Sequence, residues 1–238
     1  MVLKIDKNLQ HFEVRNLHSQ LEQQEARSVF DQTWSKDAGT EITSNLLQAM
    51  VHNGAYLSGA FINGKIVAAS FGFAAIYPEL HLHSHMTAVL PGNQNNEIGY
   101  KLKMHQKNWA KENGFSSVTW TFDPLVARNA NFNINKLKAE VVDYYPNFYG
   151  SMEDELNAGD DSDRLFVKLD TKESVTNETK KDDVQLIAIP KDIVAIRKNN
   201  LNEAREVRQN VRKRFQDLLS SGYKVIGFTN NSEYKLAK

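Results

Sequence analysis

Apolar and β-branched residues recur in short runs along the first half of the chain, and turn-forming residues separate these runs. Ala55 to Ile62 and Lys65 to Ile76 are two such runs, with Asn63-Gly64 between them. Asn-Gly accepts the positive φ angles of a tight two-residue turn, so the pattern predicts a β-hairpin. A further strand is predicted from Leu80 to Leu90, where Pro91-Gly92 ends it.

Helical spacing of apolar residues alternates with these strands. Ser19 and Glu22 form a capping box that begins a helix reaching Phe30. Ile98 to Glu112 carries apolar residues at helical spacing, and Asn113-Gly114 ends that helix. The other predicted elements are a short helix capped by Thr43 or Ser44, strands at Phe12–Leu17, Ser116–Phe122, Val141–Tyr149 and Leu165–Leu169, and a short helix at Val126–Leu137.

The order of elements between Leu80 and Asp123 predicts a βαβ unit. A right-handed crossover through the helix would place two parallel strands beside the loop that precedes it. That loop, Gln94 to Gly99, leads into a helix N-terminus, where unpaired backbone N–H groups can bind phosphate.

The C-terminal quarter differs in composition from the rest of the chain. Thr171 to Asp183 is polar and lacks aromatic residues, which predicts a linker. Val184 to Ile189, a helical stretch and Lys224 to Phe228 then predict a β-α-β extension. The expected organisation is therefore a domain over 1–170, a linker over 171–183, and an extension over 184–238 packed on the core. Four arginines lie largely off the apolar stripe of the helical stretch, and they predict either a phosphate-binding patch or a solvated helix face: Arg205, Arg208, Arg212 and Arg214.

Composition limits the function classes. The 238 residues are 41% hydrophobic, enough for a sizeable core, and the 29 basic residues balance the 29 acidic ones. A chain without net charge offers no field for nucleic acid or an anionic membrane. The absence of cysteine excludes disulfides, thiolate metal sites and cysteine nucleophiles. No signal-peptide stretch or run of about 18 apolar residues is present, so we expect a cytoplasmic protein.

The loop and its surroundings resemble the GNAT acyltransferases. Gln94-x-x-Glu97-x-Gly99 matches the first and last positions of that family's cofactor loop, but Glu97 stands where the family prefers glycine. Longer strings that are similar to one predicted GNAT subfamily are Leu82 to Thr87, Trp120 to Leu125, Arg128 to Asn133, Asn147 to Gly150, Leu156 to Gly159 and Ser162 to Leu165. A second departure is Lys138, in a Leu-Lys-Ala string where Leu-Gly-Ala is usual.

The resemblance implies a fold and a cofactor. The expected fold is α/β of the α+β type, a mixed and mostly antiparallel sheet with a splayed parallel pair and flanking helices. The cofactor would be acetyl-CoA or another acyl-CoA, with its arm between the strands at Leu80–Leu90 and Ser116–Phe122. The residues expected to contact it are Thr87, Val89, Leu90, Gln94, Asn95, Asn96, Glu97, Ile98, Gly99, Tyr100 and Asn129.

Candidate catalytic residues lie near this loop. His81, His83 and His85 alternate along one strand and would share a face, so His83 and His85 are candidate bases, or ordinary sheet residues. A metal site is not expected, because such neighbours lie about 6.8 Å apart. Asp123 either orients a base or substrate ammonium, or caps the following helix.

The tyrosine that often protonates the leaving thiolate in this family has no counterpart in Ile134 to Lys136. Tyr149 is predicted to take this role, with Tyr144 and Tyr145 as alternatives. Arg164 is expected either to bind a substrate carboxylate or to form a surface ion pair.

The function implied is transfer of an acetyl or succinyl group to a primary amine of a small molecule such as an amino acid. With no cysteine available, direct attack in a ternary complex is expected. The alternative is a catalytically weak module that binds or senses acyl-CoA. A third hypothesis is an interaction protein whose tail forms a homodimer.

Overall fold

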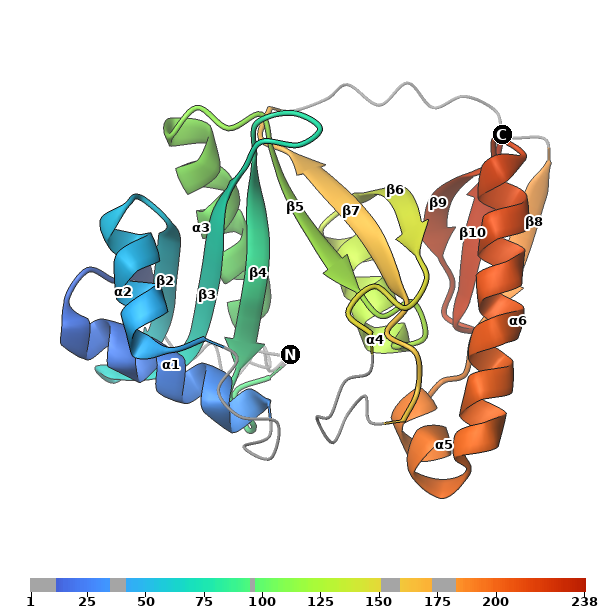
Figure 1. Ribbon diagram of the computed structural model, residues 1–238, viewed down its shortest axis with the longest axis horizontal. Helices are drawn as coiled ribbons and strands as arrows, with labels where there is room; N and C mark the ends of the chain where they lie inside the picture. The colour runs from blue at the N-terminus through green and yellow to red at the C-terminus, as the bar shows by residue number, and fades with distance from the viewer. Residues whose placement is uncertain (1–11, 35–41, 95–96, 151–158, 173–182) are drawn as a thin grey trace, which may run out of the picture. The chain divides into compact units, whose positions relative to one another are not determined.

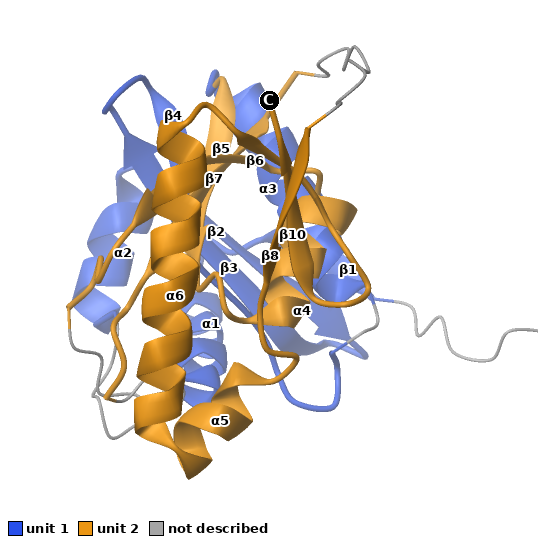
Figure 2. Ribbon diagram, turned by 90° about the vertical axis from the view of Figure 1, so that its right-hand side faces the viewer, with its two compact units in different colours: residues 1–115 blue, residues 116–238 orange. Residues whose placement is uncertain are grey.

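The computed structural model describes residues 12–34, 42–94, 97–150, 159–172 and 183–238. Its contacts divide the chain into two compact units, Met1–Phe115 and Ser116–Lys238 (Figures 1 and 2). Most of the predicted linker, residues 173–182, lies outside the described residues, as do Asn95 and Asn96. The domain boundary at 171–183 stays a prediction.

Unit 1 is built on four antiparallel strands that lie side by side in chain order. The strands are β1 (Glu13–Asn16), β2 (Tyr56–Ile62), β3 (Lys65–Ala75) and β4 (His81–Val89). The β2–β3 hairpin is confirmed, since Asn63 and Gly64 take φ angles of 50° and 76° between paired Ile62 and Lys65. Every residue of β2 is buried, which fits a strand covered on both faces.

Helices cover both faces of this sheet (Figure 1). On one face, α1 (Gln20–Thr33) and α2 (Ser44–His52) pack Val29, Phe30 and Leu47 against Phe71 and Met86. On the other face, α3 (Ile98–Glu112) packs Ile98 and Leu102 on Ala60 and Ala68. The predicted capping box is present at the start of α1, and the Thr43 side chain caps α2.

Unit 2 begins with a three-stranded antiparallel sheet in the order β5 (Ser117–Phe122), β7 (Arg164–Asp170) and β6 (Glu140–Tyr145). Two predictions are wrong in detail here. The helix expected over 126–137 is one α-helical turn, α4 (Ala127–Ala130), followed by a π-helical segment at Asn131–Lys136. The strand expected to reach Tyr149 ends at Tyr145, because Pro146 has no N–H for a ladder and Asn147 is left-handed with φ 43°.

The C-terminal segment forms a second antiparallel sheet in the order β8 (Val184–Ala188), β10 (Glu233–Ala237) and β9 (Lys224–Phe228). Strand β10 was missed in the sequence, where only four residues separate it from β9. The helical stretch is broken into α5 (Ile193–Asn199) and α6 (Leu201–Ser220) at Asn200, an extended residue whose side chain caps α6. Tyr234 of β10 donates its hydroxyl to Pro124 O at 2.8 Å, which ties this sheet to the end of β5.

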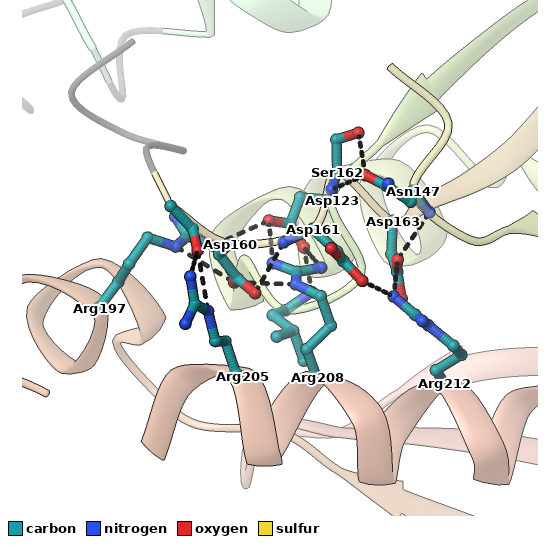
Figure 3. Close-up of polar contacts among 12 residues, drawn as sticks. Asp123, Asn147, Asp160, Asp161, Ser162, Asp163, Arg197, Arg205, Arg208 and Arg212 are labelled. Carbon is teal, nitrogen blue, oxygen red and sulfur yellow. Dashed lines mark hydrogen bonds and ion pairs between the residues drawn. The ribbon is translucent and has the colours of Figure 1, made fainter. Parts of the chain in front are cut away.

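A buried cluster of opposite charges joins α5 and α6 to the rest of unit 2 (Figure 3). Arg208 donates to both carboxylate oxygens of Asp123, at 3.2 and 3.0 Å, and to Asp160 at 2.8 Å. Arg197 contacts Asp160 at 3.1 Å and Asp123 at 3.4 Å. All four side chains are at most 6% exposed, so each charge depends on the others for its solvation.

This cluster changes the interpretation of the α6 arginines. Arg208 is buried against aspartates, Arg212 binds Asp161 and Asp163, and Arg205 donates to Gly159 O. Arg214, the fourth, is exposed. Neither a phosphate patch nor a simply solvated face describes this set, because three of the four arginines anchor the segment at 159–163.

Replacing Arg208 with Met should destabilise the protein by about 3–5 kcal/mol, since it leaves Asp123 and Asp160 buried with too little positive charge. The exposed Lys213–Asp217 pair provides a control, and Lys213→Met should cost less than about 0.5 kcal/mol. Urea unfolding of the full chain, followed by circular dichroism, measures both. Equal losses in the two variants would contradict the role given to the cluster.

Candidate functional site

The predicted cofactor loop connects β4 to α3 within unit 1. Strand β4 ends at Val89, and the Leu90 N–H still bonds Val67 O at 2.9 Å, so the loop leaves the sheet from a fixed point. Gly92 turns the chain with φ 85°. Helix α3 begins at Ile98, with Glu97 at its N-cap.

Glu97 has a left-handed backbone with φ 61° and ψ 0°, and its side chain makes no capping hydrogen bond. Lys138 is also left-handed, with φ 58°. These are the two positions where the GNAT pattern prefers glycine, the residue that adopts such angles without a steric penalty. The backbone therefore has a glycine-like conformation at both positions, although neither residue is glycine.

The other predicted cofactor contacts divide between the two units. Thr87 bonds Ser70 Oγ at 2.9 Å, and Val89 packs against the cluster of Ile98 and Leu102. Gly99 and Tyr100 are half-buried in the first turn of α3, whereas Gln94 is exposed. Asn129 lies in unit 2, half-buried on α4.

The histidines of β4 surround a β-bulge. Phe71 pairs with Met86 and Gly72 with Ser84, so His85 is the extra residue. His83 and His85 still lie side by side, with ring centroids 6.2 Å apart and both close to Phe73. His81 is buried and donates from Nδ1 to Glu79 O at 2.7 Å, the hydrogen bonding expected of an ordinary sheet residue.

The two candidate bases differ in their surroundings. Burial, and then the nearby positive charges of His85, His81 and Lys103, lower the pKa of His83 to about 4. His83 is thus neutral near pH 7 but a weak base. His85 is exposed at the bulge, where bulges commonly turn a side chain toward a site, so it is the better placed of the two.

A buried polar seam between α3 and the sheet was missed in the sequence. Lys103 Nζ donates to Ser84 Oγ at 2.6 Å and to Gln106 Oε1 at 3.2 Å. Gln106 Nε2 continues to Ser70 at 3.4 Å, and Ser70 bonds Thr87. Burial lowers the pKa of Lys103 from 10.5 to about 7. The available signal was spacing, since Lys103 and Gln106 occupy positions of the buried stripe of α3.

In unit 2, Asp123 makes the contacts of a structural residue rather than of a catalytic one. Its Oδ1 accepts from the Leu125 N–H at 2.9 Å, and both oxygens face the guanidinium of Arg208. The capping alternative is wrong, because α4 has Val126 at its N-cap and no side chain caps it. These contacts leave Asp123 poorly suited to hold a substrate ammonium.

The structure brings two other predicted site residues together. The guanidinium carbon of Arg164 lies 5.2 Å from the centre of the Tyr149 ring, and the Tyr149 hydroxyl is 3.2 Å from Thr121 Oγ1. Tyr144 is buried and donates to Asp163, and burial raises its pKa further from neutrality. Among the three candidate tyrosines, Tyr149 is therefore the exposed one with a hydroxyl partner.

No protein-family model matches the chain, and no curated protein matches its sequence. Solved structures do match. The ribosomal-protein-S18-alanine N-acetyltransferase of Escherichia coli has 13% identity, a TM-score of 0.54, and covers 71% of this chain and 100% of its own. An acetyltransferase of the GNAT family from Streptococcus pneumoniae has 14% identity and a TM-score of 0.52, covering 66% and 98%. An aminoglycoside 6'-N-acetyltransferase complexed with coenzyme A has 13% identity and a TM-score of 0.53, covering 69% and 99%.

The chain therefore has the fold of the GNAT N-acetyltransferases, as the resemblance predicted: mixed α/β, with mostly antiparallel strands flanked by helices. The matched part is 71% of this chain, which is more residues than either unit contains. The similarity therefore extends over both units. Within the described ranges, no group of three or more His, Asp or Glu residues could hold a metal ion. No helix among those residues has the length and apolarity to cross a membrane.

Stability should rise with pH between about 7 and 10.5, because in that range the unfolded chain binds a proton at Lys103 that the folded chain does not. Lys103→Met should flatten this rise. The exposed neighbour Lys101 gives the control, and Lys101→Met should keep it. The urea midpoints of the wild type and of both variants, measured across this pH range, test the prediction. A wild-type profile identical to that of Lys103→Met would show that Lys103 titrates normally.

Proposed function

We propose that this protein is an acyl-CoA-dependent N-acyltransferase that acts on the primary amine of a small molecule. The observation that carries the proposal is the left-handed turn at Glu97, which starts α3 directly after the loop leaving β4 on a GNAT fold. A helix that starts this way directs backbone N–H groups toward the loop, the arrangement that suits a pyrophosphate.

The residues of unit 1 fit such a cofactor. The loop from Gln94 to Gly99 and the end of β4 from Thr87 to Leu90 are assigned to binding acyl-CoA. The contact expected from Asn129 stays a prediction of the GNAT resemblance. The GNAT relative solved with coenzyme A supports the choice of cofactor. When bound, acyl-CoA would supply the acyl group as an activated thioester.

The remaining chemistry is assigned to side chains of this chain. His85 is exposed at the bulge and is proposed to take the proton of the acceptor amine, with His83 beside it held neutral. Tyr149, whose hydroxyl lies 3.2 Å from Thr121 Oγ1, is proposed as the acid that protonates the leaving thiolate. With no cysteine in the chain, we propose direct transfer rather than an acyl-cysteine.

The second candidate function is an acyl-CoA-binding module without turnover. It is favoured by the ion pairs that occupy Asp123 and by the pKa of about 4 at His83, which weaken two of the four catalytic candidates. Under this hypothesis the loop would bind CoA, but no amine would be acylated.

Turnover and binding separate these functions. Purified protein is mixed with acetyl-CoA or succinyl-CoA and a panel of primary amines, and free thiol is followed over time; thermal shift with CoA is measured in parallel. We expect thiol release with at least one pair, and stabilisation by CoA. Stabilisation without release would support the binding module, and the absence of both would refute both functions.

Substitutions at Glu97 separate its charge from its backbone. Glu97→Gln and Glu97→Gly both remove a carboxylate from beside the proposed phosphate site, so each should tighten CoA binding roughly fivefold. Glu97→Gly also relieves the left-handed strain, so it should be more stable than Glu97→Gln by about 1 kcal/mol. Calorimetric titration with CoA and urea unfolding measure the two effects. Unchanged CoA affinity in both variants would place the phosphates elsewhere.

A further inference from the structure

Two aromatic side chains are held in solvent by a turn that is firmly bonded. Phe148 and Tyr149 are 48% and 44% exposed, and they follow β6 in unit 2. The Phe148 N–H donates to Ser162 O at 3.1 Å, and the Tyr149 N–H to Ser162 Oγ at 2.9 Å. Ser162 Oγ also bonds Gly150 O at 2.8 Å. Exposed aromatic rings on such a fixed turn, here called the aromatic turn (residues 147–150), indicate a binding surface.

Helix α6 supports this turn through Asp163 (Figure 3). The Asn147 N–H donates to Asp163 Oδ1 at 2.9 Å, and Tyr144 donates to Oδ2. Arg212 donates to the same carboxylate from Nε at 2.9 Å and from Nη2 at 2.6 Å. Burial alone would raise the pKa of Asp163, but the hydrogen bonds from Arg212, Tyr144 and Asn147 outweigh it and lower the pKa. The buried carboxylate is thus charged and fully engaged, so α6 fixes the turn.

The side chains around the turn combine flat apolar surface with a cation. The rings of Phe148 and Tyr149 meet edge to face at 4.7 Å, and Tyr145 stacks on Phe148 at 5.2 Å. Arg164 stands over the Tyr149 ring at 5.2 Å. A guanidinium held against an aromatic ring keeps its plane oriented, and its donors match the geometry of a carboxylate.

We propose that the aromatic turn together with Arg164 is a binding site for an amine that carries a carboxylate next to an aromatic or branched apolar group, that is, an apolar amino acid. The apolar group would lie on Phe148 and Tyr149, and the carboxylate on Arg164. This inference rests on the proposed function only where it treats the bound amine as the acyl acceptor. Binding of the amino acid itself is testable without acyl-CoA.

The test uses the full chain and two probes of the same ring size. L-phenylalanine carries the carboxylate, and 2-phenylethylamine lacks it. Binding is followed by NMR, on the backbone amides of Phe148 and Tyr149 in labelled protein without CoA. We expect L-phenylalanine to shift these amides and to bind at least about tenfold more tightly than 2-phenylethylamine.

Variants assign the contacts. Arg164→Met should weaken L-phenylalanine binding about tenfold, whereas Lys168→Met, four residues further along β7, should leave it unchanged. Phe148→Ala should weaken both probes. Equal affinity for the two probes, an unaffected Arg164→Met, or the absence of any shift at the aromatic turn would each overturn the proposal. CoA stabilisation measured on the same sample keeps that failure distinct from failure of the acyltransferase function.

The support that α6 gives to the aromatic turn can be tested by hydrogen exchange. Arg212→Met should speed hydrogen exchange at the Phe148 and Tyr149 amides and weaken L-phenylalanine binding, and Arg212→Lys should restore part of both. Arg205→Met removes a neighbouring arginine that bonds Gly159 O and not Asp163, so it should change neither. Unchanged exchange in a folded Arg212→Met protein would refute the support from α6.

Discussion

Unit 2 can bury Asp123, Asp160, Arg197 and Arg208 only because each charge faces opposite ones at hydrogen-bond distance. An isolated ion in such an interior would cost several kcal/mol, so the four side chains must assemble together. They come from the end of β5, from the segment before β7, and from α5 and α6. Their mutual requirement fixes where the C-terminal helices meet the sheet of unit 2, and the adjacent Arg212–Asp163 contact extends the same arrangement to the aromatic turn.

In unit 1, the polar seam from Lys103 through Gln106 and Ser70 to Thr87 links α3 to β4 by hydrogen bonds rather than by apolar packing alone. Such bonds require a definite register between helix and strand, whereas apolar contacts tolerate sliding. The seam meets β4 on either side of the bulge at His85. The same contacts therefore hold the strand that we assign to acyl-CoA and the histidine that we assign to the amine.

Glu97 and Lys138 take a backbone conformation that glycine adopts more readily. A non-glycine residue in the left-handed region costs about 1 kcal/mol or more, and the surrounding elements supply the stability that keeps it there. At Glu97 the constraint is the short path from β4 into α3. At Lys138 it is the sharp exit from the π-helical segment into β6. In both cases this chain has a left-handed backbone at a position where the GNAT pattern prefers glycine.

Local sequence determined the elements whose signals lie in a few neighbouring residues: the Asn63-Gly64 hairpin, the Ser19 and Glu22 capping box, and the α3 helix ended by Asn113-Gly114. The resemblance carried by Trp120 to Asn133 and by the loop indicated the fold. Tertiary structure alone decided that Arg208 faces Asp123 across 85 positions of chain, that His85 sits on a bulge, and that Tyr149 meets Arg164. These outcomes depend on contacts between residues distant in sequence, and neither periodicity nor turn chemistry encodes which buried charge will find which partner.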